Sequence, residues 1–407
     1  MGDKDISRFK SDGMRNIRFG KSDKKRNFIF MSLFENVDVW AEDICWFFDE
    51  KAMLTVFQAL EYPEEIFPPL KTAAEELRRN KGLQAEFLKF HQLWRNDRKN
   101  EMEDPKKILW NALVVLSEMP VLFQKHRDLK IPWKVTVDTL RDLPRRMREY
   151  FDRGGTWGFD AQTWMHIHME GKLYQIGRLQ YAPGKQRYPA NVFWNGKQLI
   201  ALARPDVGCD EQGWVRKEEE AKWTTTWNEQ DGMIEAHAVA ADGSIERTVT
   251  RLSKKEFRCL LDANSSILHV HIPMGEKLSA ASCRESVANA FLFFDRYFPE
   301  VQWKAACCSS WLLDRGMKNF LPETSNILAF EKMFFPLPAL NTSDHGHYRW
   351  VFGKGINAET ARKMEAKTRL QRGIVRYVEN GGILKTGAGC IIKESWMREA
   401  TGMPDKA

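Results

Sequence analysis

The chain has 407 residues, enough for two or three domains with separate hydrophobic cores. Hydrophobic residues make up 43% of it and aromatic residues 12%, which excludes an intrinsically disordered protein. The net charge of +7 does not point to a nucleic-acid partner. Residues 1–30 hold nine Lys or Arg against four Asp or Glu, which leaves only +2 for everything after them.

The elements predicted before residue 154 are helical. Residues 1–30 are polar and basic, and they predict a disordered or loosely attached tail. From residue 31 to 153 the apolar residues recur at helical spacing, as in Phe87, Phe90 and Trp94, and strand signals are nearly absent. This pattern predicts a helical N-terminal domain of five or six segments.

The most apolar of these segments, residues 108–116, is expected to stop at Glu118 and Pro120. It is far too short to span a bilayer, so no membrane span is expected. The glycine pair in residues 152–156 marks the expected hinge to a second domain, residues 154–407.

The second half alternates strand-like runs with helical ones. Asn195-Gly196 and Asp242-Gly243 predict hairpins. The expected strands are 173–181, 191–194, 198–203, 223–227, 233–239, 267–272, 303–313 and 347–352, and the expected helices are 160–171, 285–297, 326–334 and 358–380. This order predicts an α+β fold, a mostly antiparallel sheet with helices on its faces.

The segment from Ser266 to Ser279 combines a strand, a glycine turn and a helix start. Residues 267–272 form a short apolar run, Pro273 ends it, Gly275 permits a tight turn and Ser279 is placed to cap the next helix. Unpaired N–H groups at a helix start bind anions, so the turn can hold a phosphate, with Lys277 as an extra cation. An ordinary strand-to-helix connection has the same pattern.

Several segments in one order carry a resemblance to a known family. They are Gly177-Arg-Leu-Gln-Tyr181, Glu235-Ala-His237, His269-Val-His-Ile-Pro273, Cys308-Ser-Ser-Trp-Leu-Leu-Asp314, Leu321-Pro-Glu-Thr-Ser-Asn-Ile-Leu328, Leu370-Gln-Arg372 and Thr386-Gly-Ala-Gly389. Together they resemble a bacterial family of acyltransferases that pair an N-acyltransferase N-terminal helical domain with a GNAT-like C-terminal domain. No single segment is specific, whereas the ordered set is.

The resemblance implies an acyl-CoA site at the turn. In GNAT folds the pyrophosphate lies on the helix start after a central strand, and the next strand splays away to admit pantetheine. Residues 267–272 and 303–313 match these two strands, and the Asn-x-x-Ala pattern that begins at Asn326 resembles the start of the pantetheine-contacting helix. The implied cofactor-binding residues are Met274, Gly275, Glu276, Lys277, Leu278, Ser279, Ser310 and Asn326. The turn departs from the usual GNAT loop in having one glycine and an acidic residue, Glu276.

Histidines are the candidate bases for deprotonating an attacking amine. His269 and His271 project from one face of their strand, and His237 lies two residues after Glu235 on another strand. His237 and His271 are expected to meet at one sheet edge, with His237, His271 and Glu235 as the catalytic candidates. The alternative is that these histidines are ordinary hydrogen-bonded polar residues. The tyrosine that many GNAT enzymes use as general acid is missing from residues 330–334, so that role stays unassigned.

Other chemistries stay open on the same residues. Covalent acyl transfer through Cys308 or Ser310 is one, although buried cysteines are more often small core residues. A zinc hydrolase built on His166, His168, His237 and His271 requires a strand where the pattern favours a helix. A non-catalytic GNAT-like ligand-binding or regulatory protein is the main alternative to an enzyme.

The sequence thus predicts a cytoplasmic acyl-CoA-dependent N-acyltransferase acting by direct attack in a ternary complex. The seven cysteines include no Cys-x-x-Cys pair, which favours a reducing compartment over a disulfide framework or structural zinc. The expected acceptor is a small-molecule amine or an amino-acid-like compound. Neither a metal, nor a nucleic acid, nor a membrane span is expected.

Overall fold

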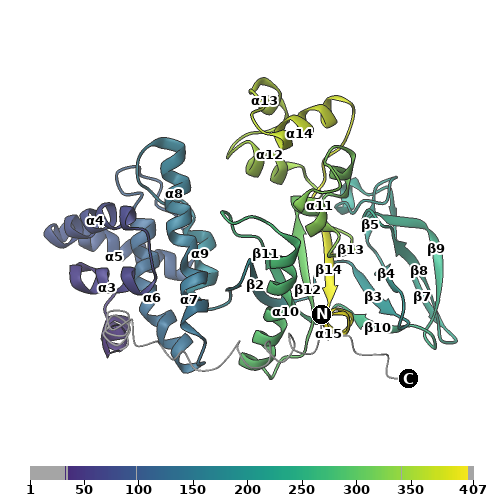
Figure 1. Ribbon diagram of the computed structural model, residues 1–407, viewed down its shortest axis with the longest axis horizontal. Coiled ribbons are helices and arrows are strands. Elements are labelled where there is room, and N and C mark those ends of the chain that lie inside the picture. The colour runs from purple at the N-terminus through teal and green to yellow at the C-terminus, as the bar shows by residue number, and fades with distance from the viewer. Residues whose placement is uncertain (1–32, 34, 98, 341, 402–407) are drawn as a thin grey trace. The chain divides into compact units, whose positions relative to one another are not determined.

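The computed structural model describes residues 33, 35–97, 99–340 and 342–401 (Figure 1). The basic tail expected at residues 1–30 lies outside these residues. The chain divides into two compact units. The first runs to Ile176 and includes Pro273–Gly275, and the second comprises Gly177–Ile272 and everything from Glu276 onward. Residues 152–156, the expected hinge, form the end of a helix, where Gly155 has φ 70°.

The first unit is helical, as predicted. Its core contains the fully buried Val56, Leu77, Phe87 and Leu116. Its helices include α3 (Glu50–Ala59), α4 (Phe67–Arg79), α5 (Lys81–Asn96), α6 (Trp110–Asp128), α7 (Trp133–Leu140), α8 (Asp142–Gly154) and α9 (Gln162–Met169), with 3-10 turns η1 (Trp46–Phe48) and η2 (Glu64–Ile66). The strand β1 (Tyr174–Ile176) ends the unit.

Helix α6 continues through Pro120, so the prediction that it stops there was wrong. A proline has no N–H, which leaves the carbonyl four residues earlier, that of Leu116, without its helical donor. The indole Nε1 of Trp46 donates to this carbonyl at 3.0 Å. A side chain 70 residues away therefore supplies the missing hydrogen bond, and the helix runs on.

The second unit contains a mixed sheet. Its strands in this unit are ordered β2 (Leu179–Lys185), β11 (Ser266–His271), β12 (Trp303–Ser310), β14 (Gly387–Ile392) and β13 (Phe335–Leu337). Only the β11–β12 pair is parallel among them, and it is linked by helix α10 (Ala280–Tyr297). The short helix α11 (Asn326–Glu331) follows β12 through the 3-10 turns η4 (Trp311–Leu313) and η5 (Arg315–Asn319).

A second, antiparallel sheet completes this unit. It is ordered β10 (Arg258–Leu261), β3 (Ala190–Trp194), β4 (Leu199–Ala203), β8 (Met233–Val239) and β7 (Trp227–Gln230), with β9 (Ile245–Ser253) also pairing β8. The remaining pieces are the β5 (Gly208–Cys209) and β6 (Trp223–Thr224) pair, the 3-10 turn η3 (Glu218–Glu220) and helix α15 (Lys393–Thr401). Gly196 and Gly243, each with φ 93°, make the two predicted hairpin turns.

Helix α10 covers one face of the mixed sheet and the second sheet covers the other, so the predicted α+β class is confirmed. On one face Tyr181 contacts Ser286 of α10, with 2.8 Å between their hydroxyl oxygens. On the other face Ile267 and Cys307 share a core with Val192 and Ala201 of the second sheet. The mixed sheet therefore lies between α10 and the second sheet.

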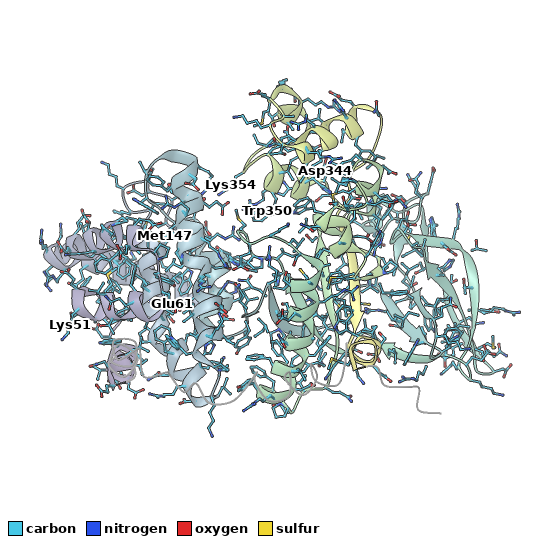
Figure 2. All side chains as sticks on the ribbon, viewed as in Figure 1. Lys51, Glu61, Met147, Asp344, Trp350 and Lys354 are labelled. Atoms are coloured by element: carbon cyan, nitrogen blue, oxygen red, sulfur yellow. The ribbon has the colours of Figure 1, made fainter. Side chains whose placement is uncertain are left out.

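Three more helices lie between β13 and β14. They are α12 (His345–Val351), α13 (Ala358–Lys363) and α14 (Arg369–Glu379), and we call residues 345–385 the helical insertion (Figure 1). The strand predicted at 347–352 was wrong, because α12 occupies it and buries Tyr348 in the insertion's own core. The helix predicted at 358–380 is two helices, since Asn357 and Thr368 each begin one with a capping box. Trp350 and Lys354 mark the α12 end of the insertion in Figure 2.

Candidate active site

The parallel strands β11 and β12 pair only over part of their length. Their register runs from Ser266 opposite Trp303 to His269 opposite Cys307. Beyond this point β11 continues along β2 to His271 opposite Gln180, while β12 continues along β14 to Ser310 opposite Gly387. Each strand thus follows its other neighbour, and the two diverge after His269 and Cys307.

Helix α10 begins just after this divergence. Ser279 is its N-cap, as predicted, and its hydroxyl accepts a hydrogen bond from the Ser282 N–H at 3.1 Å. Within the described residues no partner is recorded for the N–H groups of Ala280 and Ala281. Free N–H groups at a helix start carry partial positive charge and bind anions. The start of α10 therefore has the properties of a phosphate site.

The turn before α10 has the backbone that its glycine predicts. Gly275 has φ 105°, a value that side chains disfavour, and a Cβ placed there would meet nothing within 4 Å. The side chains of Met274, Glu276 and Lys277 are exposed. Met274 and Gly275 group with the first unit and Glu276 to Ser279 with the second, so the turn is described here along the chain alone.

Arg178, which the sequence analysis did not single out, donates hydrogen bonds to the backbone of this turn. Arg178 is 7% exposed, and its guanidinium donates from Nη2 to the Glu276 carbonyl at 2.8 Å and from Nε to the Lys277 carbonyl at 3.3 Å. A guanidinium has five N–H donors in a rigid fork, so one side chain can fix two successive carbonyls. The only sequence signal was its place in the segment Gly177 to Tyr181.

Ser310 and Asn326 come from neighbouring elements. Ser310 is the last residue of β12 and the N-cap of η4, and its hydroxyl accepts a hydrogen bond from the Leu312 N–H at 3.2 Å. Asn326 is the first residue of α11, and Ser325 caps that helix. Helix α11 packs against η4 and α10. The two residues therefore belong to elements in contact beyond the end of β12.

The candidate histidines do not share a sheet. His237 lies in β8 of the second sheet and His271 in β11 of the mixed sheet. The expectation that they meet at one sheet edge differs from the structure, because the strands that carry them belong to different sheets. His271 is partly exposed and lies two residues past the last β11–β12 pair.

Both ring nitrogens of His237 are hydrogen-bonded. Nδ1 lies 3.0 Å from the Glu246 carbonyl, which can only accept, so Nδ1 carries the proton. Nε2 then accepts from the Thr226 hydroxyl at 3.2 Å. The side chain is 5% exposed and packs against the Trp223 ring at 5.2 Å. These contacts are those of a satisfied structural histidine.

Glu235 lies on the same strand in an exposed ion pair. Its carboxylate accepts from Arg251 Nε at 2.6 Å and from Asn228 at 3.3 Å. These hydrogen bonds and the charge of Arg251 lower the pKa of Glu235. A carboxylate held in its charged form is a weaker base, so this arrangement does not favour proton transfer at Glu235.

The cysteines of β12 are not set up as nucleophiles. Cys308 is 1% exposed, and burial raises its pKa to about 12. Burial also raises the pKa of Cys307 well above its usual value, with the neighbouring Cys390 and Cys308 adding to the effect. The thiolate is the reactive form, so both residues are inert near neutral pH and act as core residues.

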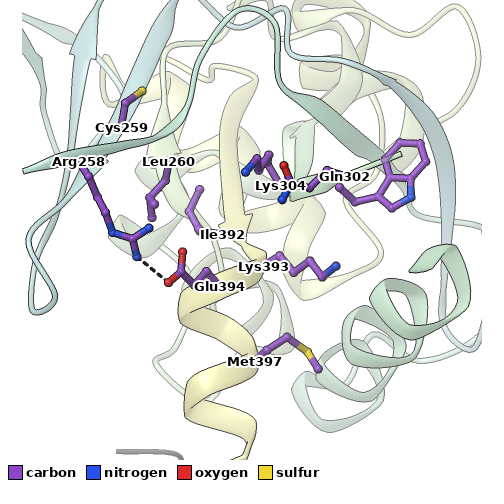
Figure 3. Close-up of a pocket in the computed structure, with 10 residues that line it drawn as sticks. Arg258, Cys259, Leu260, Gln302, Lys304, Ile392, Lys393, Glu394 and Met397 are labelled. Carbon is purple, nitrogen blue, oxygen red and sulfur yellow. Dashed lines mark hydrogen bonds and ion pairs between the residues drawn. The ribbon is translucent and has the colours of Figure 1, made fainter. Parts of the chain in front are cut away.

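A surface pocket of about 500 Å³ lies at the N-terminal end of β12 (Figure 3). Trp303, the first residue of β12, lines it together with Leu260 and Ile392, and an ion pair joins Arg258 to Glu394 across it. Ser310 is at the other end of the strand, so this pocket is separate from the diverging strands.

The described part of the chain contains no group of three or more His, Cys, Asp or Glu that could hold a metal ion. His166 and His168 lie on helix α9, as predicted, and His168 Nε2 contacts Asp142 at 3.1 Å. Among the same described residues, every helix falls short of the length and apolar character required to cross a bilayer.

Comparison with known proteins defines the class. Residues 52–171 match the N-acyltransferase N-terminal domain, and residues 173–391 match the GNAT-like C-terminal domain. The chain therefore belongs to the GNAT-like family that the sequence motifs indicated, and it is an acyltransferase by this membership. The search of curated proteins gave no match.

Solved structures share the fold. An acyltransferase in complex with decanoyl-CoA is 20% identical, with a TM-score of 0.53 over 83% of this chain and 86% of its own. A mutant acyltransferase in complex with octanoyl-CoA is 18% identical, with a TM-score of 0.55 over the same shares. An acyltransferase in complex with decanoyl-CoA and teicoplanin is 18% identical, with a TM-score of 0.53 over 90% of this chain and 99% of its own.

Proposed function

We propose that this protein is an acyl-CoA-dependent N-acyltransferase that acts on an amine of a small molecule. The observation that carries the proposal is the divergence of β11 and β12 directly before the capped start of α10. The pyrophosphate would lie on the N–H groups at the start of α10, and the pantetheine arm would enter between the diverging strands. The similarity to acyltransferases whose structures contain acyl-CoA supports this cofactor.

The proposed reaction is direct attack in a ternary complex. The amine nitrogen bonds to the thioester carbonyl carbon, the carbon–sulfur bond breaks, and coenzyme A leaves as its thiolate. The proton lost by the amine goes to a base, for which we propose His271, because it is the candidate histidine on a strand that borders the divergence. Backbone N–H groups near the diverging strands would stabilise the oxyanion.

A structural neighbour supports the proposed acceptor class. One structurally similar acyltransferase holds teicoplanin, a small molecule, beside decanoyl-CoA. We therefore retain a small-molecule amine as the acceptor class and leave its identity to experiment. The proposed compartment is the cytoplasm, which agrees with seven free cysteines.

A thermal-shift titration with CoA tests the cofactor site. Specific binding raises the melting temperature of the folded protein, and Gly275→Asp is expected to abolish this rise, because it adds a repulsive charge and a strained residue to the turn. Gly196→Asp is the matched control, since Gly196 also has a positive φ with open space around it but lies in the β3–β4 hairpin. An equal CoA shift in folded Gly275→Asp protein would place the cofactor elsewhere.

A further inference from the structure

The helical insertion concentrates the positive charge of the chain. Residues 345–385 hold nine Lys or Arg against three Asp or Glu, a net charge of +6. The whole chain carries +7, of which residues 1–30 account for +5. All other residues together therefore carry a net charge of −4, and the insertion stands out as a basic module on an acidic body.

The insertion is fastened to the end of β12. Asp314, which follows η4, lies with Oδ2 3.0 Å from His347 Nε2 and accepts from the Lys385 backbone N–H at 2.9 Å. His347 belongs to α12, and Lys385 is the last residue of the insertion. Both ends of the insertion thus meet one buried carboxylate, just beyond the strand that diverges from β11.

A pocket of about 650 Å³ lies between α14 and the end of η5. Arg369, Arg372 and Arg376 line one side of it, and Asn319 and Phe320 line the other. Its ten lining residues, all of them described, include neither Asp nor Glu. The pocket therefore presents three cations and amide groups with no carboxylate to neutralise them.

This arrangement is unfavourable for an isolated helix. The three arginines are spaced i, i+3 and i+7, which stacks like charges on one face of α14. Two of them, Arg369 and Arg372, lie in the first helical turn, where the helix dipole disfavours cations, and that turn has no acidic residue. By contrast, α13 pairs Lys363 with Glu359 at 2.6 Å. A bound anion would relieve the repulsion in α14.

Two features prepare the pocket for an anion. Arg372 donates from Nη1 to the carbonyls of Ala366 and Lys367 at 3.1 and 2.9 Å, which fixes the guanidinium, and no partner of its Nε or Nη2 is recorded among the described residues. The rings of Phe320 and Tyr377 lie 5.2 Å apart and form an apolar wall. Gly373 lets the Phe320 ring lie close to the backbone of α14, because a Cβ at this position would lie 2.6 Å from Phe320 Cδ2.

We propose that the arginine pocket of α14 binds a phosphate- or sulfate-type oxyanion. Guanidinium groups bind such oxyanions through paired charge-assisted hydrogen bonds, which a chloride ion cannot match. The adjacent rings would contact an apolar or planar part of the same ligand. This site is distinct from the start of α10 and does not depend on the proposed acyl transfer.

Isothermal titration of the full chain with inorganic phosphate, at constant ionic strength set with chloride, tests the site without CoA. We expect Arg376→Gln to raise the phosphate dissociation constant at least tenfold. Arg362→Gln is the matched control, because it removes the same charge from α13 of the same insertion but does not line the pocket. It should leave phosphate binding within about twofold of the wild type.

Two results would overturn the proposal: no phosphate binding by the wild type, or equal affinity in the Arg376→Gln and wild-type proteins. Arg376 is exposed, so the variant should fold, and its circular dichroism spectrum checks this. A third arm identifies the source of the anion. Displacement of phosphate by CoA but not by 3′-dephospho-CoA would assign the pocket to the cofactor's 3′-phosphate, whereas no displacement by either would assign it to another anionic ligand such as the acceptor.

Discussion

Replacing Arg178 tests whether the turn before α10 is held ready for the cofactor. Arg178→Met removes the hydrogen bonds to the carbonyls of Glu276 and Lys277. A hydrogen bond of this kind contributes about 1 kcal/mol net, and a charged donor somewhat more. Because Glu276 and Lys277 are exposed, water can replace the lost donors, so we expect the fold to survive with about 2 kcal/mol less stability.

The larger consequence should be on CoA binding. A turn without its guanidinium must be ordered when CoA binds, and about 1.4 kcal/mol of ordering cost weakens binding tenfold. Isothermal titration with CoA should therefore show a dissociation constant raised about tenfold in Arg178→Met.

Arg178→Lys separates geometry from charge, because it keeps the cation but loses the fork. If the fork positions the turn, the Lys variant should bind CoA nearly as weakly as the Met variant. Wild-type affinity in Arg178→Lys would mean that charge alone matters, and wild-type affinity in both variants would refute the positioning role.

Three further predictions follow from contacts described above. His271→Gln should lower turnover by roughly 10²–10⁴-fold with CoA binding retained, whereas His237→Gln should act mainly on stability. Equal turnover in both variants and the wild type at saturating amine would contradict base catalysis by histidine. Trp46→Phe should lower the free energy of unfolding in urea by about 1–3 kcal/mol, because the Leu116 carbonyl loses its donor. Adding Pro120→Ala should recover part of this free energy by supplying an N–H. No recovery would show that lost indole packing is responsible. Burial raises the pKa of Glu118, but hydrogen bonds from His91 and Arg95 outweigh this effect, so the pKa is lowered overall. The charged carboxylate therefore stabilises the fold above its unfolded pKa of about 4.3, and this stabilisation is lost as the pH falls further. Glu118→Gln should then be less stable than wild type by about 3 kcal/mol at pH 7, with the gap closing below pH 4 in denaturant titrations; a gap that does not change with pH would contradict the charged pair.

Local signals accounted for most of the correct predictions. Ser279 caps α10 because a serine hydroxyl satisfies an N–H three residues on, and this needs only neighbouring residues. Gly196 and Gly243 form hairpin turns for an equally local reason. The divergence of β11 and β12 was expected from the family resemblance, not from any property of the residues themselves.

Two of the failures share a cause, which is that a distant group decided the outcome. Pro120 does not end α6 because Trp46 donates to the orphaned carbonyl. Residues 347–352 combine aromatic and β-branched side chains, which favour a strand, yet burial of Tyr348 against the insertion's core selects a helix. The break after Lys363 did have a local signal in Thr368 and Gln371, the capping box that begins α14.

For the candidate site, the sequence could predict the local geometry of the contiguous part alone. Residues 274–279 follow one another, so their turn could be inferred from their order alone. Arg178 lies 98 residues before Glu276, and only the antiparallel pairing of β2 with β11 brings it to the turn. His237 and His271 were expected to converge because both precede turns, but a sequence does not say which strands share a sheet.

The helical insertion leaves and rejoins the sheet at adjacent points, since Leu337 of β13 lies opposite Ala388 of β14. A short hairpin could therefore close the same two strands, and the entropy of closing a loop grows only slowly with its length. The insertion can lengthen, shrink or change its charge while the strands that frame the start of α10 keep their register. Ligand range and cofactor chemistry would then be free to change separately, and a chimaera with another insertion between β13 and β14 is a practical route to altered selectivity.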